Sequence, residues 1–106
     1  MNEKTIEKLK NIKTRFLEIE DLMGDPQNAS NPETITKLAK EHNQLKNIVS
    51  LFDQYNHFAK ELINSKKIED TDSDPDIIEL AKIEQKEISE KIHLISKKLE
   101  KELIPK

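Results

Sequence analysis

Gly24 is the only glycine in this chain of 106 residues. Phosphate-binding loops, nucleophile elbows and dinucleotide-binding fingerprints need clustered glycines, because only a residue without a side chain lets the backbone approach a ligand closely. A chain with a single glycine can build none of these sites. The scarcity favours long regular helices and a role in recognition or scaffolding.

The composition supports a helical fold, with 37% charged residues, 34% hydrophobic residues and no Cys or Trp. A disordered chain of similar charge would scatter its Ile and Leu, whereas here they recur at helical spacing. The missing cysteines exclude disulfides and thiolate chemistry. No apolar stretch is long enough for a signal peptide or a membrane span, so we expect a cytoplasmic protein.

The apolar pattern predicts a first helix over about residues 4–23. Its buried face steps by three and four residues through Leu9, Ile12, Phe16, Ile19 and Met23. We expect Gly24 to end this helix in the left-handed conformation, and Pro26 to prevent its continuation.

A second helix is predicted over about 32–66, because Asn31 before Pro32 forms a typical N-cap. Its apolar seam keeps a three-four alternation over four heptads and includes His42, which we interpret as a polar residue that sets the helix register. A second apolar stripe widens this face enough for two neighbouring helices.

A third helix is predicted over about 75–103, capped by Asp74 ahead of Pro75. The expected fold is a single all-α domain over 1–106, an antiparallel three-helix bundle or coiled coil. At 1.5 Å per residue the first helix spans ~30 Å and the others ~45–50 Å. The second and third helices should therefore extend as a hairpin that protrudes beyond the first.

Residues 68–76 carry five acidic side chains and no basic one. We interpret this block as an exposed linker at the tip of the hairpin. A metal site is the alternative interpretation, but the spacing of Asp72, Asp74 and Asp76 lacks the glycine and the terminal glutamate of a calcium loop.

The three histidines, His42, His57 and His93, are the obvious candidates for catalysis. None has a helical partner at a metal-binding spacing, and none adjoins a strained loop that could build a catalytic triad. We predict a non-enzymatic chain without a metal or a cofactor. The mixed charges of the helix faces also argue against membrane binding and against independent sequence-specific binding of nucleic acid.

Four segments resemble a known family. They are residues 22–26 (LMGDP), 31–33 (NPE), 38–45 (LAKEHNQL) and 103–106 (LIPK). In order and spacing they resemble the N-terminal helical domain of the bacterial peptide chain release factor 1 family over essentially the whole chain. The release factor 2 family is less similar at the glycine stop and the terminal segment.

This resemblance implies a factor that enters the ribosomal A site, reads UAA or UAG and triggers hydrolysis of peptidyl-tRNA. The family's Gly-Gly-Gln and Pro-x-Thr motifs lie in other domains. Gly-Gly-Gln cannot occur here, and Pro32-Glu33-Thr34 matches the second motif by chance, because it opens a helix. No catalytic residue is carried over to this chain.

The resemblance further implies that this segment lies near the stalk base of the large ribosomal subunit and near the class II release factor GTPase. The first helix is basic at its start and acidic at its end, the reverse of what the helix dipole favours. A docking surface is expected at Lys8, Lys10, Lys13, Phe58 and Leu62, with weak ribosomal-RNA contact through the lysines. A free-standing coiled-coil adaptor and a tRNA-binding arm of a synthetase remain alternatives.

Overall fold

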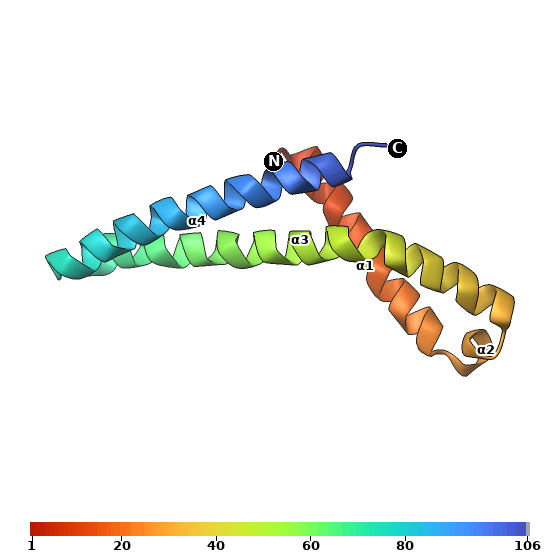
Figure 1. Cartoon of the computed structure of the whole chain (residues 1–106). Coiled ribbons are helices and arrows are strands. Elements are labelled where there is room, and N and C mark those ends of the chain that lie inside the picture. The colour runs from red at the N-terminus through yellow and green to blue at the C-terminus, as the bar shows by residue number, and fades with distance from the viewer. Residues whose placement is uncertain (106) are drawn as a thin grey trace. The chain divides into compact units, whose positions relative to one another are not determined.

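The computed structural model describes residues 1–105, so Lys106, which closes the LIPK segment, lies outside the described residues. Four helices follow one another: α1 (Glu3–Gly24), α2 (Pro26–Ala29), α3 (Pro32–Thr71) and α4 (Pro75–Glu102) (Figure 1). The expected all-α fold is confirmed. The chain divides into two compact units, Met1–Ser50 and Leu51–Lys106, and α3 contributes its first part to one and its second part to the other.

In the first unit, α1 lies beside the first part of α3, and α2 lies in the connection between them (Figure 1). α1 begins at Asn2, whose side chain accepts a hydrogen bond from the Thr5 amide at 2.8 Å. Leu9, Ile19, Ile48 and Val49 are the buried apolar side chains of this unit among residues 1–50.

The expectation for Gly24 is wrong. Gly24 is the last residue of α1, and no residue between 1 and 105 has a positive φ. The helix ends instead because Asp25 is extended, donates its N–H to the Leu22 carbonyl at 3.2 Å, and caps the next helix through its carboxylate. A chain that turns directly into a new helix needs no left-handed residue.

The stretch between the first two predicted helices, 4–23 and 32–66, contains α2, so residues 1–105 form four helices where three were predicted. Pro26 occupies the first turn of α2 with its φ already fixed, and Asp25 accepts the Gln27 amide at 3.0 Å. Asn28 ties this short helix back to α1 by donating its side-chain amide to the Leu22 carbonyl at 2.9 Å.

The cap of α3 is confirmed, because the Asn31 side chain accepts the amides of Glu33 and Thr34, each at 3.2 Å. The predicted end at residue 66 is wrong, since α3 continues to Thr71. The acidic block 68–76 is therefore not all linker: its first four residues are helical, and only residues 72–74 connect α3 to α4.

In the second unit, α3 and α4 form an antiparallel hairpin (Figure 1). Asp74 caps α4 as expected and accepts the Asp76 amide at 2.9 Å. The two helices are joined by a buried hydrogen bond, in which Ser65, 2% exposed, donates its hydroxyl to the Ala81 carbonyl at 3.0 Å. Beyond the predicted end at residue 66, Glu69 accepts the side-chain amide of Gln85 at 2.8 Å, and this contact with α4 accounts for the longer α3.

The buried face of α4 follows a heptad pattern. Its buried members are Ala81, Ile88, Ile95 and Leu99, and α3 adds Leu51, Phe52 and Ser65. The first position of the seam is thus the small Ala81, while the adjacent Leu80 is 66% exposed. No helix within residues 1–105 combines the length and the apolarity that a membrane crossing requires.

Candidate docking surfaces

The three lysines predicted to dock lie on α1 but not on one face. At ~100° per residue, Lys8 lies ~160° from Lys10 around the helix, whereas Lys10 and Lys13 are ~60° apart. Lys8 and Lys10 are exposed, and Lys13 is half-buried. The helix therefore brings Lys10 and Lys13 together and turns Lys8 away from both.

Lys10 lies in an electrostatically mixed surface. It borders a shallow hollow on α1 together with Glu3, Ile6, Glu7 and Asn11. Two carboxylates within two turns of Lys10 reduce its attraction for a polyanion. Any contact of this surface with RNA should therefore be weak and sensitive to salt.

Phe58 and Leu62 lie on α3 in the second unit, and both are half-buried. The Lys91 ammonium of α4 lies 5.3 Å from the centre of the Phe58 ring, and the His57 ring meets that ring edge-on at 5.2 Å. Lys91 and His57 thus cover much of the Phe58 ring, and only the rest of the ring is accessible to a partner.

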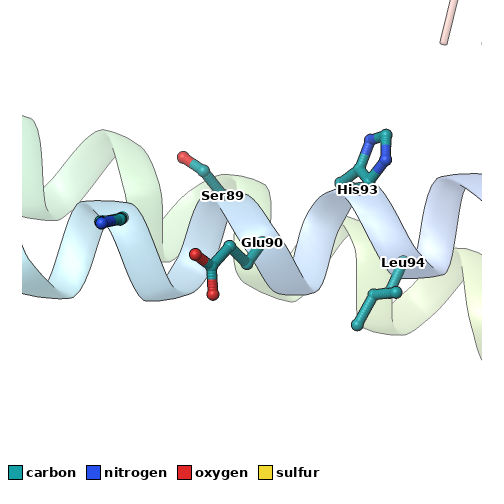
Figure 2. Close-up of a pocket in the computed structure, with 5 residues that line it drawn as sticks. Ser89, Glu90, His93 and Leu94 are labelled. Carbon is teal, nitrogen blue, oxygen red and sulfur yellow. The ribbon is translucent and has the colours of Figure 1, made fainter.

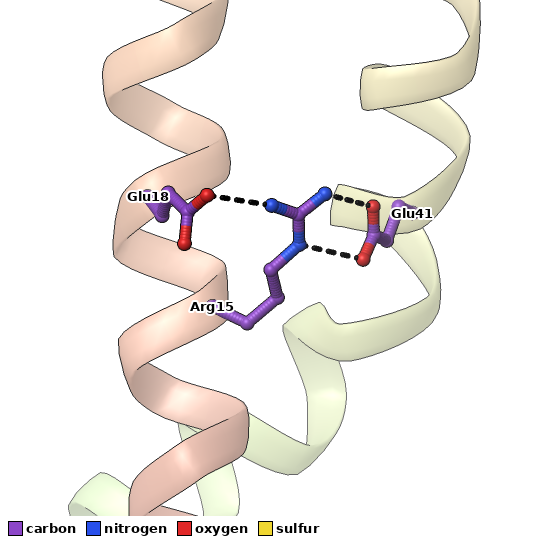
Figure 3. Close-up of polar contacts among 3 residues, drawn as sticks. All are labelled: Arg15, Glu18 and Glu41. Atoms are coloured by element: carbon purple, nitrogen blue, oxygen red, sulfur yellow. Dashed lines mark hydrogen bonds and ion pairs between the residues drawn. The ribbon is translucent and has the colours of Figure 1, made fainter.

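Arg15, the only arginine, joins α1 to α3 within the first unit (Figure 3). Its Nε and Nη2 donate to the two carboxylate oxygens of Glu41 at 2.9 and 2.8 Å, and its Nη1 donates to Glu18 at 2.9 Å. These hydrogen bonds lower the pKa of the Glu41 carboxyl below its ordinary value and raise the pKa of Arg15. Local spacing gives no signal for this bidentate pair, because Arg15 and Glu41 are 26 residues apart in the chain.

His42 also links the two helices of the first unit. Its ring stacks on Phe16 with centroids 4.3 Å apart and an interplanar angle of 22°. Its Nε2 lies 3.2 Å from a carboxylate oxygen of Glu20. His42 therefore lies at the contact between α1 and α3, as expected for a polar residue in the apolar seam. Its role in setting the helix register stays a prediction.

An exposed apolar surface on α4 was missed. Leu80, Ile83 and Leu94 are 66%, 50% and 61% exposed. Leu94 borders a shallow hollow with Lys86, Ser89, Glu90 and His93, and Figure 2 shows Glu90 and Leu94 on one side of the helix, with Ser89 and His93 on the other. The signal is present in the sequence as a second three-four spacing on the third predicted helix, through Leu80, Ile83, Glu87, Glu90 and Leu94.

Residues 12–106 match the family model of the PCRF domain. The chain belongs to the PCRF domain family. The matched region covers most of α1 and the whole of α2, α3 and α4. This family assignment agrees with the resemblance of the four short sequence segments to the release factor 1 family.

Several relatives are named peptide chain release factor 1. The protein from Chloroherpeton thalassium is 37% identical over 100 residues, which cover 94% of this chain and 28% of the relative. Those from Caldicellulosiruptor saccharolyticus and Mycoplasma mycoides are 34% and 32% identical, over 95% and 100% of this chain and 28% and 29% of the relatives. The PCRF-domain chain thus spans less than a third of their length. No solved structure matches it.

Proposed function

We propose that this chain is the N-terminal domain of a cytoplasmic peptide chain release factor 1 and acts in translation termination at UAA and UAG codons. The observation that carries the proposal is the PCRF-domain match over residues 12–106, together with relatives of that name. On this proposal the chain itself performs no chemistry. Its work is to dock the factor near the stalk base of the large ribosomal subunit, within reach of the class II release factor GTPase.

The helices offer two elements for such docking. The first is the Lys10 and Lys13 side of α1, which would contact ribosomal RNA; Lys8 would make a separate contact from another side of the helix. The second is the open part of Phe58 and Leu62 on α3. Neither element needs a large core, because each consists of side chains on a single helix.

The first test is the reading frame that encodes this chain. The proposal requires a Gly-Gly-Gln codon run downstream of Lys106. A stop codon directly after Lys106 would withdraw the termination role and leave a free-standing helical binding protein.

The second test uses the whole factor in a reconstituted release assay with UAA, UAG and UGA ribosomal complexes. We expect release at UAA and UAG only. A Lys10→Glu/Lys13→Glu variant and a Phe58→Ala/Leu62→Ala variant should bind ribosomes more weakly, while a Lys46→Glu/Lys60→Glu control on exposed parts of α3 should not. Unchanged ribosome binding in both docking variants would refute these surfaces without affecting the codon test.

A further inference from the structure

α4 has a second stripe of side chains besides its buried seam. The stripe consists of Asp76, Leu80, Ile83, Glu87, Glu90 and Leu94, spaced by four, three, four, three and four residues. This is the alternation of a coiled-coil seam. At ~100° per residue it lies ~120° around the helix from the buried seam that contacts α3.

The apolar side chains of the stripe are exposed to solvent. Leu80, Ile83 and Leu94 are between 50% and 66% exposed, whereas Ala81, in the seam, is 3% exposed. Scattered single apolar residues on a surface need no explanation, but three at seam spacing on one helix face form a strip that can receive a further helix.

The charges on the stripe identify the kind of helix that fits. Asp76, Glu87 and Glu90 are its polar members, and no basic residue occupies any of its six positions. Two lysines lie near the stripe. Lys91 is directed elsewhere, since its ammonium lies over the Phe58 ring, and Lys86 flanks one edge of the stripe, where it borders the same hollow as Glu90 and Leu94. A partner helix must therefore present apolar side chains to Leu80, Ile83 and Leu94, and cationic side chains to the carboxylates between them.

The same charges disfavour the other candidate occupants. In a second copy packed antiparallel about the centre of the stripe, near residue 85, Glu87 and Glu90 of one chain would face Ile83 and Leu80 of the other, and Asp76 would face Leu94. Each carboxylate would then be desolvated against an apolar side chain without a cationic partner, which is costly. RNA is disfavoured because its phosphates would face three carboxylates.

We propose that the outer face of α4, Asp76 to Leu94, is a docking site for a cationic amphipathic helix of a partner protein. The site takes that helix lengthwise, because the 18 residue steps from Asp76 to Leu94 span ~27 Å, close to five helical turns. The inference rests on the side chains of α4 alone and does not depend on the proposed role in termination.

The test uses the 106-residue chain and a fluorescein-labelled synthetic peptide of three heptads, with Leu at the a and d positions and Lys at e and g. A second peptide replaces every Lys by Glu. We expect the Lys peptide to bind, the Glu peptide not to bind, and the affinity to fall between about 0.1 and 0.5 M salt. Binding is followed by fluorescence anisotropy.

Two variants locate the site. Leu80→Ser/Leu94→Ser should weaken binding of the Lys peptide by at least ~tenfold, because two exposed anchors are lost. Ile63→Ser is the matched control, since Ile63 on α3 is also 66% exposed. Glu87→Lys/Glu90→Lys should abolish binding of the Lys peptide, whereas Glu100→Lys, on another face of α4, should not. Circular dichroism checks that every variant is folded.

Several outcomes would overturn the proposal. They are absence of binding to the Lys peptide, equal binding of both peptides, and full binding by the Leu80→Ser/Leu94→Ser variant. Tighter binding of a labelled poly(U) RNA that is lost in this variant would assign the face to nucleic acid instead. A sedimentation mass that rises with concentration, and returns to the monomer value in the same variant, would assign it to a second copy.

Discussion

Arg15 and Glu41 form the one bidentate arginine–carboxylate pair of the first unit among residues 1–50. The planar guanidinium satisfies both carboxylate oxygens, which a lysine cannot do. The resulting decrease in the pKa of Glu41 ties part of the unit's stability to the ionised carboxylate. This contribution is complete above the unfolded pKa of ~4.3 and is lost as the pH falls through the lower folded pKa.

We therefore expect Arg15→Gln to lower the free energy of unfolding at pH 7, and the difference from the wild type to shrink as the pH falls below ~4. Urea denaturation at a series of pH values measures this difference. Lys46→Gln on exposed α3 is the control, which removes a positive charge elsewhere. A difference that stays constant with pH would contradict the assigned role of Glu41.

Ser65 is the buried polar side chain of the second unit within residues 51–105, and its hydroxyl donates to the Ala81 carbonyl. We expect Ser65→Ala to cost ~0.5–1.5 kcal/mol through the lost hydrogen bond, and Ser65→Leu to cost ~1–3 kcal/mol because the larger side chain overpacks this contact. Urea denaturation measures both. Asn64→Leu, at the exposed neighbouring position, should change stability by less than ~0.5 kcal/mol.

At the scale of single elements, the sequence marks the starts of α3 and α4, but it does not mark the end of α3. Asn31-Pro32 marks the start of α3, and Asp74-Pro75 marks the start of α4. Both signals are local, because an N-cap and the fixed φ of proline act within four residues. The end of α3 has no local signal, since the contact that supports its last part joins Glu69 to Gln85 of α4, 16 residues later in the chain. The acidic charge of residues 68–76 predicted a linker, but residues 68–71 are helical.

The docking residues also depend on contacts between helices that the sequence pattern does not show. Helical spacing placed Phe58 and Leu62 on an apolar face, but it could not reveal that Lys91 of another helix covers part of that face. Leu80 and Ala81 are adjacent, and the apolar pattern alone does not decide which of them is buried. In the structure Ala81 lies in the seam, where its carbonyl accepts the Ser65 hydroxyl, and Leu80 is exposed.

Gly24 provides an element-scale prediction. It is helical, and a Cβ built on it would meet no atom within 4 Å. Gly24→Ala should raise the free energy of unfolding by ~0.4–1 kcal/mol, chiefly by restricting the unfolded chain. Thermal and urea unfolding measure the gain. Ala39→Gly, at an exposed interior position of α3, should have the opposite effect of ~1 kcal/mol. A loss of stability in Gly24→Ala would mean that this position needs glycine after all.

At the scale of the whole molecule, α3 is the element that contributes residues to both compact units. Its 40 residues contain no internal glycine or proline after Pro32. Ser50→Pro, at the boundary between the units, should cost ~3 kcal/mol or more, because proline removes a helical hydrogen bond and clashes with the preceding turn. Urea denaturation of Ser50→Pro and of Ser50→Ala, as the side-chain control, measures this cost. A proline tolerated at this position would contradict a continuous α3.

The tip of the hairpin, where three residues join α3 to α4, has a consequence for the length of the hairpin. The seam behind it repeats every seven residues, as Ala81, Ile88 and Ile95 show. If one heptad is deleted or inserted on each side of residues 72–74, the remaining positions face the same partners as before. A paired deletion or insertion of one heptad would thus change the length of the hairpin without changing which side chains meet in the rest of its seam.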